Sequence, residues 1–211
     1  MKVLAISDAV AEVLFTERIR DHCAGVRLVL SCGDLPFDYL EYIVTMLNVP
    51  LLYVLGNHDH VRHRADGTRQ EGPAGGLNVD GRVARIADET QRSIRVAGLE
   101  GSMFYGGGAH QYTEGQMVGK ALALAPRLLR SRLFSRGPLD VLLTHAAPRG
   151  IHDGKDPCHR GFRSFRTLVE TFQPRYLLHG HVHPSYGYDV APRVLGKTTI
   201  VHVYRYVFLE I

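Results

Sequence analysis

The sequence predicts an α/β protein with a parallel sheet at its centre. Three apolar runs of strand length lie at residues 2–7, 27–31 and 50–55. Segments with helical character at 9–21 and 36–47 separate these runs. This alternation is typical of parallel sheets with right-handed crossover connections. Because the runs are almost continuously apolar, we expect both faces of the sheet to be covered.

The rest of the chain predicts further strands, loops and helices. We expect a loop at 60–76, short strands at 77–79, 82–86 and 93–99, a glycine-rich loop at 101–110, buried strands at 139–143 and 175–178, a long loop at 146–160, a helix at 162–172 and a closing β-region from 186 to 211. Thr113 and Gln116 have the spacing of a capping box, which predicts the start of another helix. Pro126 is expected to break or kink that helix and to leave a basic segment at 127–136. Because no repeat or linker is visible, we expect one domain over residues 1–211.

The composition indicates a folded protein of a reducing compartment. Of the 211 residues, 45% are hydrophobic and 22% are charged, which is ordinary for a globular protein. Three cysteines without a C-x-x-C pair argue against a disulfide framework and against a cysteine-based zinc site. The apolar runs are far shorter than the roughly 20 residues that a membrane-spanning helix needs. We therefore expect a cytoplasmic protein without a membrane partner.

Five of the predicted strands are followed by residue types that bind metals. They are Asp8, Gly33-Asp34, Gly56-Asn57-His58-Asp59, Thr144-His145 and Gly180-His181-Val182-His183. Each residue alone has an ordinary explanation as a turn, a helix cap or a buried polar group. In open α/β sheets, however, ligands bind at the carboxyl ends of strands, so we expect these side chains to lie together. Oxygen and imidazole donors without thiolate suit manganese, iron or zinc.

This ordered set resembles the calcineurin-like metallophosphoesterase superfamily, whose pattern is D-x-H, G-D, G-N-H-[DE], H and G-H-x-H. The resemblance covers about residues 2–185. It implies a four-layer α/β/β/α sandwich with two central mixed sheets. It also implies a phosphoesterase that uses a metal-activated water and two divalent metal ions, with manganese favoured over iron or zinc. Within that class, a small phosphodiester is favoured over a phosphomonoester as the substrate.

The resemblance also assigns roles to the motif residues. Two metals that share a bridging carboxylate can clamp a phosphoryl group for in-line attack. By resemblance, the first metal is held by Asp8, Asp34 and His183, and the second by Asp34, Asn57, His145 and His181. His58 matches the family's histidine that binds no metal and either stabilises the transition state or protonates the leaving oxygen. For Asp59 two readings stay open, because this carboxylate can orient His58 or cap the loop.

One position departs from the family pattern. Val10 stands where the first motif has a histidine, and a valine side chain offers no lone pair. The first metal therefore lacks one protein ligand, and we expect it to bind more weakly than the second. Water is the favoured replacement ligand, because no spacing selects His110, His152 or His159.

Substrate-contacting residues are expected in two loops. Arg149, His152 and His159 lie in the polar loop after the predicted strand 139–143, and His110 ends the glycine-rich loop. These residues are candidates for binding the substrate phosphate, and an ordinary surface loop is an equally good explanation.

Two other functions stay open. A nuclease would need a basic groove, and a net charge of +4 is modest for one. The arginines at 127, 130, 132 and 136 share a helix with leucines and look like an ordinary amphipathic exterior. The second alternative is a protein-binding scaffold whose metal site has decayed. The loss of histidine at Val10 favours a scaffold, whereas retention of His58 favours an enzyme.

Overall fold

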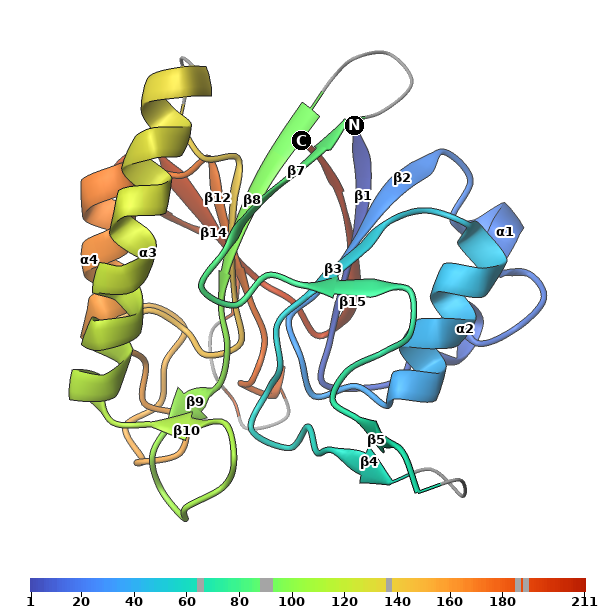
Figure 1. The fold of residues 1–211 in the computed structure, drawn as a ribbon, viewed down its shortest axis with the longest axis horizontal. Helices are drawn as coiled ribbons and strands as arrows, with labels where there is room; N and C mark the ends of the chain where they lie inside the picture. The colour runs from blue at the N-terminus through green and yellow to red at the C-terminus, as the bar shows by residue number, and fades with distance from the viewer. Residues whose placement is uncertain (64–66, 88–92, 136–137, 185–186, 188–189) are drawn as a thin grey trace.

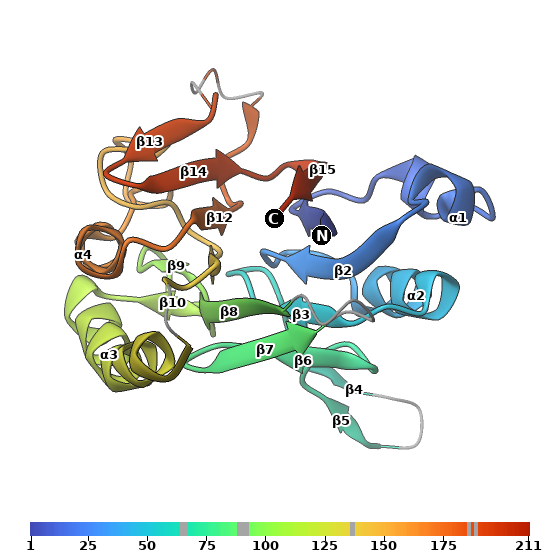
Figure 2. The ribbon, with the colours of Figure 1, turned by 90° about the horizontal axis from the view of Figure 1, so that it is seen from above.

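Two mixed sheets lie face to face in the computed structural model, and helices cover the outer face of each sheet (Figures 1 and 2). The structure describes residues 1–63, 67–87, 93–135, 138–184, 187 and 190–211. Helices α3 (Glu114–Ser135) and α4 (Arg163–Phe172) cover the six-stranded sheet. Helices α1 (Ile19–His22) and α2 (Phe37–Leu47) cover the five-stranded sheet. The predicted four-layer sandwich is therefore confirmed.

The five-stranded sheet carries the first three predicted strands side by side. Its strand order is β15-β1-β2-β3-β6, with β15 at Arg205–Glu210, β1 at Lys2–Ser7, β2 at Val26–Ser31, β3 at Leu51–Tyr53 and β6 at Gly76–Asn78. Neighbouring strands are parallel from β1 to β6, whereas β15 runs antiparallel to β1.

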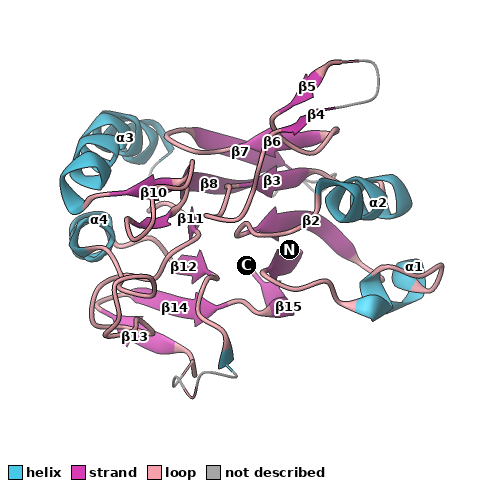
Figure 3. Ribbon diagram, turned by 90° about the horizontal axis from the view of Figure 1, so that it is seen from below, coloured by secondary structure: helices cyan, strands magenta, loops and turns pink. Residues whose placement is uncertain are grey.

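The six-stranded sheet has a parallel centre and antiparallel edges (Figure 3). Its strand order is β13-β14-β12-β11-β8-β7, with β13 at Arg193–Leu195, β14 at Thr198–His202, β12 at Tyr176–His179, β11 at Val141–Thr144, β8 at Ser93–Leu99 and β7 at Val83–Ala87. The two edge strands, β13 and β7, each pair antiparallel with their neighbour. The predicted closing β-region therefore supplies strands to both sheets.

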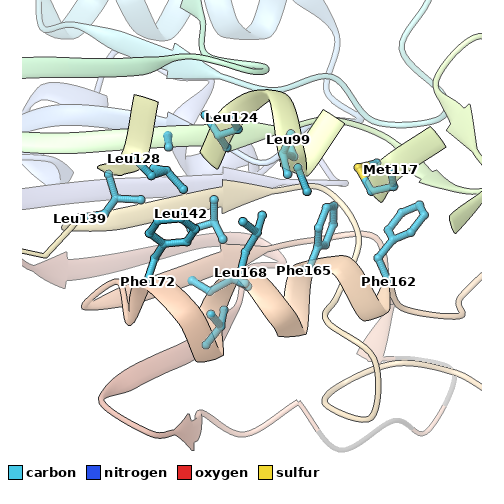
Figure 4. Packing of buried hydrophobic residues seen from close by; sticks show 14 of the residues in the cluster. Leu99, Met117, Leu124, Leu128, Leu139, Leu142, Phe162, Phe165, Leu168 and Phe172 are labelled. Atoms are coloured by element: carbon cyan, nitrogen blue, oxygen red, sulfur yellow. The ribbon is translucent and has the colours of Figure 1, made fainter. Parts of the chain in front are cut away.

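Alternating side chains of one strand enter different hydrophobic layers. In β1, Val3 and Ala5 pack between the two sheets, whereas Leu4 and Ile6 pack against the layer of α1 and α2. In β11, Leu142 lies in the cluster beneath α3 and α4, together with Phe165 of α4 (Figure 4). Because successive side chains of a strand point to opposite faces, strands covered on both faces must be apolar throughout. This burial explains the continuous apolar runs of the sequence.

The helix expected at 9–21 does not form as one element. The structure has only a 3-10 turn at Glu12–Leu14 and the single-turn helix α1. Val10, Val13 and Phe15 are exposed hydrophobic side chains, so the apolar positions of this segment do not line up on one helical face. The β-branched residues of the segment also favour helix weakly. The helical prediction for this segment was therefore wrong over most of its length.

Helix α3 begins as predicted but does not stop where expected. The Thr113 amide donates to Gln116 Oε1 over 2.8 Å, and the Gln116 amide donates to Thr113 Oγ1 over 3.3 Å, which confirms the capping box. The helix then continues through Pro126 to Ser135, so the predicted break was wrong, whereas the alternative of a kink stays a prediction. Its buried face, formed by Met117, Ala121, Leu124 and Leu128, spans the proline. The free energy gained by burying this face offsets the loss of the backbone hydrogen bond that proline removes.

No helix in the described part of the chain is long and apolar enough to cross a membrane.

Two predicted loops contain short strands. The segment expected as a loop at 60–76 holds the antiparallel pair β4 (Arg62–His63) and β5 (Arg69–Gln70). The glycine-rich loop begins with β9 (Ser102–Met103), which pairs in parallel with β10 (Gln111–Tyr112). Figure 1 shows both small sheets at the lower edge of the molecule.

A partly buried cation fastens α3 to the six-stranded sheet. Lys120 Nζ donates to Asp80 Oδ2 over 2.7 Å and lies 3.4 Å from Glu100 Oε1. Burial alone would raise the pKa of Glu100, but the nearby His110 imidazole, a hydrogen bond from Tyr112 and the charge of Lys120 lower it to about 2. Because this folded-state pKa is lower than the unfolded value, the stabilisation is present at neutral pH and is lost as the pH falls towards 2.

We expect Lys120→Met to lower the free energy of unfolding by about 1–3 kcal/mol, because Asp80 and Glu100 lose a charge partner at a site with limited solvent screening. Urea unfolding at pH 7 measures the change. Arg127→Met is the control, since Arg127 lies on the exposed face of the same helix and contacts the Ala123 carbonyl. Equal stability of the two variants would contradict the fastening role of Lys120.

Candidate metal centre

The carboxyl ends of strands from both sheets meet at one edge of the molecule, the lower edge in Figure 1. Donor atoms of Asp34, His145 and His181 all lie within 4.8 Å of one another there. His145 Nε2 is 3.3 Å from Asp34 Oδ2 and 3.0 Å from Asn57 Oδ1. The structure thus brings together the four residues that were expected to hold the second metal.

Backbone carbonyls fix the orientation of both buried imidazoles. His145 Nδ1 lies 2.8 Å from the Cys32 carbonyl, and His181 Nε2 lies 2.9 Å from the Cys158 carbonyl. A ring nitrogen that faces a carbonyl oxygen must carry a hydrogen and donate a hydrogen bond. In a neutral imidazole, the other ring nitrogen then has a free lone pair. His145 Nε2 and His181 Nδ1 are therefore the nitrogens available to a metal.

The surroundings of His145 Nε2 are those of a cation site. Asn57 Nδ2 donates to the Tyr105 hydroxyl over 3.0 Å, so the amide oxygen of Asn57 is the atom that faces His145. Asp34 adds a carboxylate oxygen on the same side. An imidazole lone pair, an amide oxygen and a carboxylate oxygen repel one another unless a proton or a metal ion lies between them. These donor types fit a borderline divalent metal.

The pKa values of this pair follow from the same arrangement. Burial alone would lower the pKa of His145, but the charge of Asp34 and the hydrogen bond to it raise the pKa to about 9. Burial alone would raise the pKa of Asp34, but His145 and the His58 amide hold it well below its usual value. In the metal-free protein, a proton on His145 therefore takes the place of a cation.

Asp8 and His183 lie beside this cluster. Both carboxylate oxygens of Asp8 accept from the His181 amide over 3.0 Å, and the side chain is only 1% exposed. His183 Nε2 is 3.9 Å from Asp8 Oδ1, and its side chain is 35% exposed. These residues and Asp34 form the expected first site, which is more open to solvent than the second. Their roles as ligands stay predictions.

Three of the candidate ligands, Asp8, Asp34 and His181, have an unusual backbone conformation. Asp8, Asp34 and His181 have φ angles of 63°, 56° and 71°, in the left-handed region. Before Asp34, Gly33 has φ 100°, and a Cβ there would lie 2.4 Å from the Gly56 amide nitrogen. Only glycine permits this close approach of two strand-end loops. The glycines noted in the sequence thus bring the donor-bearing loops together.

Asp59 connects the loops after β2 and β3 through hydrogen bonds, whereas the neighbouring His58 side chain faces solvent. Asp59 Oδ2 accepts from the Gly56 amide over 2.7 Å and from the Asp34 amide over 2.9 Å. Of the two readings of Asp59, the loop cap matches these contacts. The His58 amide donates to Asp34 Oδ1 over 2.8 Å, and its exposed side chain lines a hollow of about 370 Å³ together with Arg62. An imidazole at this position can transfer a proton to a group bound in the hollow.

The candidate substrate residues separate into two groups. His159 lies at the centre, with its ring centroid 5.3 Å from that of His181 and its Nδ1 3.0 Å from Asp156 Oδ1. The other three candidates make contacts outside the donor cluster. His110 Nδ1 is 3.3 Å from Glu100, Arg149 is 3.6 Å from Asp153, and His152 lies between His179 Nε2 at 2.9 Å and the Ala191 carbonyl at 2.7 Å.

Tyr105 is a site residue that the sequence reasoning missed. Its hydroxyl accepts from Asn57, and the residue is 40% exposed. The pairing spans 48 residues between two loops, so no local spacing could have indicated it. Its place inside the glycine-rich loop was the available signal.

Comparisons with known proteins bear on the family and the fold. A family model described as calcineurin-like phosphoesterase matches residues 1–185. A crystal structure of TT1561 from Thermus thermophilus is similar, with a TM-score of 0.58 and 17% identity, over 95% of this chain and 88% of that one. A structure described as GAP50, the anchor in the inner membrane complex of Plasmodium, has a TM-score of 0.54 and 10% identity. The match covers 96% of this chain and 70% of that chain. A comparison with curated proteins gives no match.

The two solved structures support the fold alone, because their identities are low. The family model covers most of the chain, including every motif residue from Asp8 to His183. Members of this superfamily are generally hydrolytic and bind divalent metals, and the chain has candidate ligands for them. The chain therefore belongs to the calcineurin-like phosphoesterase family.

Proposed function

We propose that this protein hydrolyses a small phosphodiester at a centre of two divalent metal ions. The observation that carries the proposal is the set of lone-pair donors around His145 Nε2, which hydrogen bonds from Asn57 and His145 to other groups hold in place. Asp34, Asn57, His145 and His181 would hold one ion, and Asp8, Asp34 and His183 the other. When bound, such ions polarise a phosphoryl group and lower the pKa of a water. Manganese is the first candidate, ahead of iron and zinc.

The residues around the centre support substrate binding and proton transfer. His58 lies in the open hollow beside Asp34, where it can give a proton to the leaving oxygen. Arg62 lines the same hollow, and its guanidinium hydrogen-bonds Asp38. Tyr105 and His159 border the centre on the side of the two long loops. A small phosphorylated substrate fits this arrangement better than a nucleic acid, which would need an extended basic groove.

The proposal is tested with protein that has been stripped of metal and then given manganese. We expect turnover of bis(p-nitrophenyl) phosphate, weaker turnover of p-nitrophenyl phosphate, and metal bound in stoichiometric amounts. Hydrolysis of the monoester alone would overturn the choice of a diester. Metal binding without turnover of either substrate would favour the scaffold alternative, to which the loss of histidine at Val10 already points.

The first metal site provides a separate prediction. We expect the second site to fill first, and Val10→His to tighten the first site by about tenfold, which corresponds to about 1.4 kcal/mol. Val10 is 36% exposed, so a larger ring has room to extend. Titration calorimetry with manganese measures both affinities.

Val13→His is the matched control, because Val13 is similarly exposed but follows no motif residue. It should leave both affinities unchanged. Two equal affinities in the unmodified protein would show that the first site is not weakened.

A further inference from the structure

The outward face of α3 carries an apolar stripe that nothing in the described structure covers. Val118, Leu122, Leu129 and Leu133 are all exposed hydrophobic residues. Their separations of 4, 7 and 4 residues place them on one side of a helix. Leu133 is 77% exposed, and the neighbouring Phe134 is 80% exposed. An ordinary amphipathic exterior was expected here, but the exposed side of the helix carries these apolar residues as well as its arginines.

Cations lie on both sides of this stripe. Arg127 and Arg130 line one hollow beside Phe134, which also includes Arg82. Arg132 lines a second hollow beside Leu133, on the other side of the helix. Arg175 and Lys197 line that second hollow too, and Arg175 also lies 3.5 Å from Asp140. We call this surface, which consists of the stripe, Phe134 and these six cations, the basic–apolar ridge.

The charge of the ridge excludes some partners. The sequence has no acidic residue from 115 to 139, so α3 has no carboxylate beyond Glu114, its first residue, and its C-terminal half presents arginines alone. A second copy centred on Leu129 and Leu133 would bring the arginines of both helices together, and like charges in contact are unfavourable. A partner that fits the ridge therefore has negatively charged groups next to an apolar region.

The shape of the ridge favours a flat partner. Figure 1 shows the last turns of α3 extending past α4 at the upper edge of the molecule. Leu133 and Phe134 belong to these last turns and are largely exposed. Projecting apolar side chains between arginines match the interface of a bilayer, where anionic headgroups lie above the acyl chains. An acidic protein would offer the charge, but it would need a groove to receive the two side chains.

We propose that the basic–apolar ridge docks this protein on anionic membrane surfaces, with Leu133 and Phe134 inserted among the lipids and the arginines on the headgroups. This proposal revises the expectation of no membrane partner. The ridge ends at the edge of the molecule opposite the metal centre (Figure 1). A docked molecule therefore keeps its metal centre open to solvent, and the inference does not depend on the proposed activity.

Vesicle flotation tests the docking. We expect the protein to bind equimolar phosphatidylglycerol–phosphatidylcholine vesicles, to bind pure phosphatidylcholine at least about tenfold more weakly, and to dissociate in high salt. Leu129→Ser/Leu133→Ser/Phe134→Ser and Arg127→Glu/Arg130→Glu should each reduce binding by about tenfold or more. The control is Arg18→Glu/Arg20→Glu, an equal charge change on exposed residues at α1, which should bind like the unmodified protein.

Insertion is tested by fluorescence. The chain has no tryptophan, so Phe134→Trp introduces a single reporter. Its emission should shift to the blue on anionic vesicles, whereas Phe104→Trp, at a 52% exposed phenylalanine near the metal centre, should not shift.

Four results would overturn the proposal. The first is no binding to anionic vesicles, and the second is unchanged binding by the serine variant. The third is a dimer in lipid-free sedimentation that the serine variant makes monomeric, because a second copy would then cover the stripe. The fourth is full competition of poly-glutamate with vesicles while the emission of the Phe134→Trp variant stays unshifted, which would assign the ridge to an acidic protein instead.

Discussion

Asp34→Asn is expected to abolish phosphoesterase turnover and to remove most of the bound metal. Asp34 lies where both proposed sites meet, with one carboxylate oxygen 3.3 Å from His145 Nε2 and the other accepting from the His58 amide. An amide keeps one acceptor oxygen but loses the negative charge that two cations share. Turnover and metal content, measured on the same preparation, give the two effects together.

The fold should survive this change, because the asparagine can still accept from the His58 amide. Asp21→Asn is the control, since Asp21 is an exposed aspartate in the single-turn helix α1. It should keep full activity and metal content. Normal turnover by Asp34→Asn would contradict the dinuclear assignment, even if the metal content fell.

His58→Ala is expected to lower turnover by roughly 10²–10⁴-fold, the usual contribution of a general acid. The His58 side chain is exposed beside Asp34, and only its backbone amide contacts that carboxylate. The metal content should therefore stay near that of the unmodified protein. The loss should be smaller for a substrate with a better leaving group, which needs less help from an acid.

His63→Ala is the matched control, an exposed histidine in the short strand β4. It should change turnover only slightly. If His58→Ala loses metal together with activity, His58 is a ligand and its proposed role is wrong. If turnover of substrates with good and with poor leaving groups falls by the same factor, His58 acts on the phosphoryl group rather than on the leaving oxygen.

The site could be predicted from the sequence because its residues occur in short motifs at strand ends. A parallel topology brings such ends together, whatever the distance between them along the chain. Tyr105 and the Cys158 carbonyl could not be found in this way, because they enter the site from loops that only the tertiary structure positions. His152 lies in a polar loop that suggested a pocket, and the structure buries it against His179, so its role in substrate binding stays a prediction.

The fold was predictable to a similar extent. Continuous apolar runs indicated the buried strands, since both faces of each sheet are covered. Pro126 was misread because a local helix breaker was weighed without the buried face that spans it. The prediction of a helix at 9–21 was wrong because residues that are compatible with a helix do not share a face there that the core could bury.

The left-handed conformations of Asp8, Asp34 and His181 set stability against activity. A residue other than glycine pays roughly 1–2 kcal/mol for this region of φ, with aspartate among the more tolerant types. Glycine in place of Asp8 or His181 would relax the backbone and also remove a side chain whose charged form is disfavoured by burial. The strain at these positions therefore opposes folding, and a sandwich without these candidate ligands would carry less of it. Strained conformations at candidate ligands are what a requirement for function, rather than for folding, would produce.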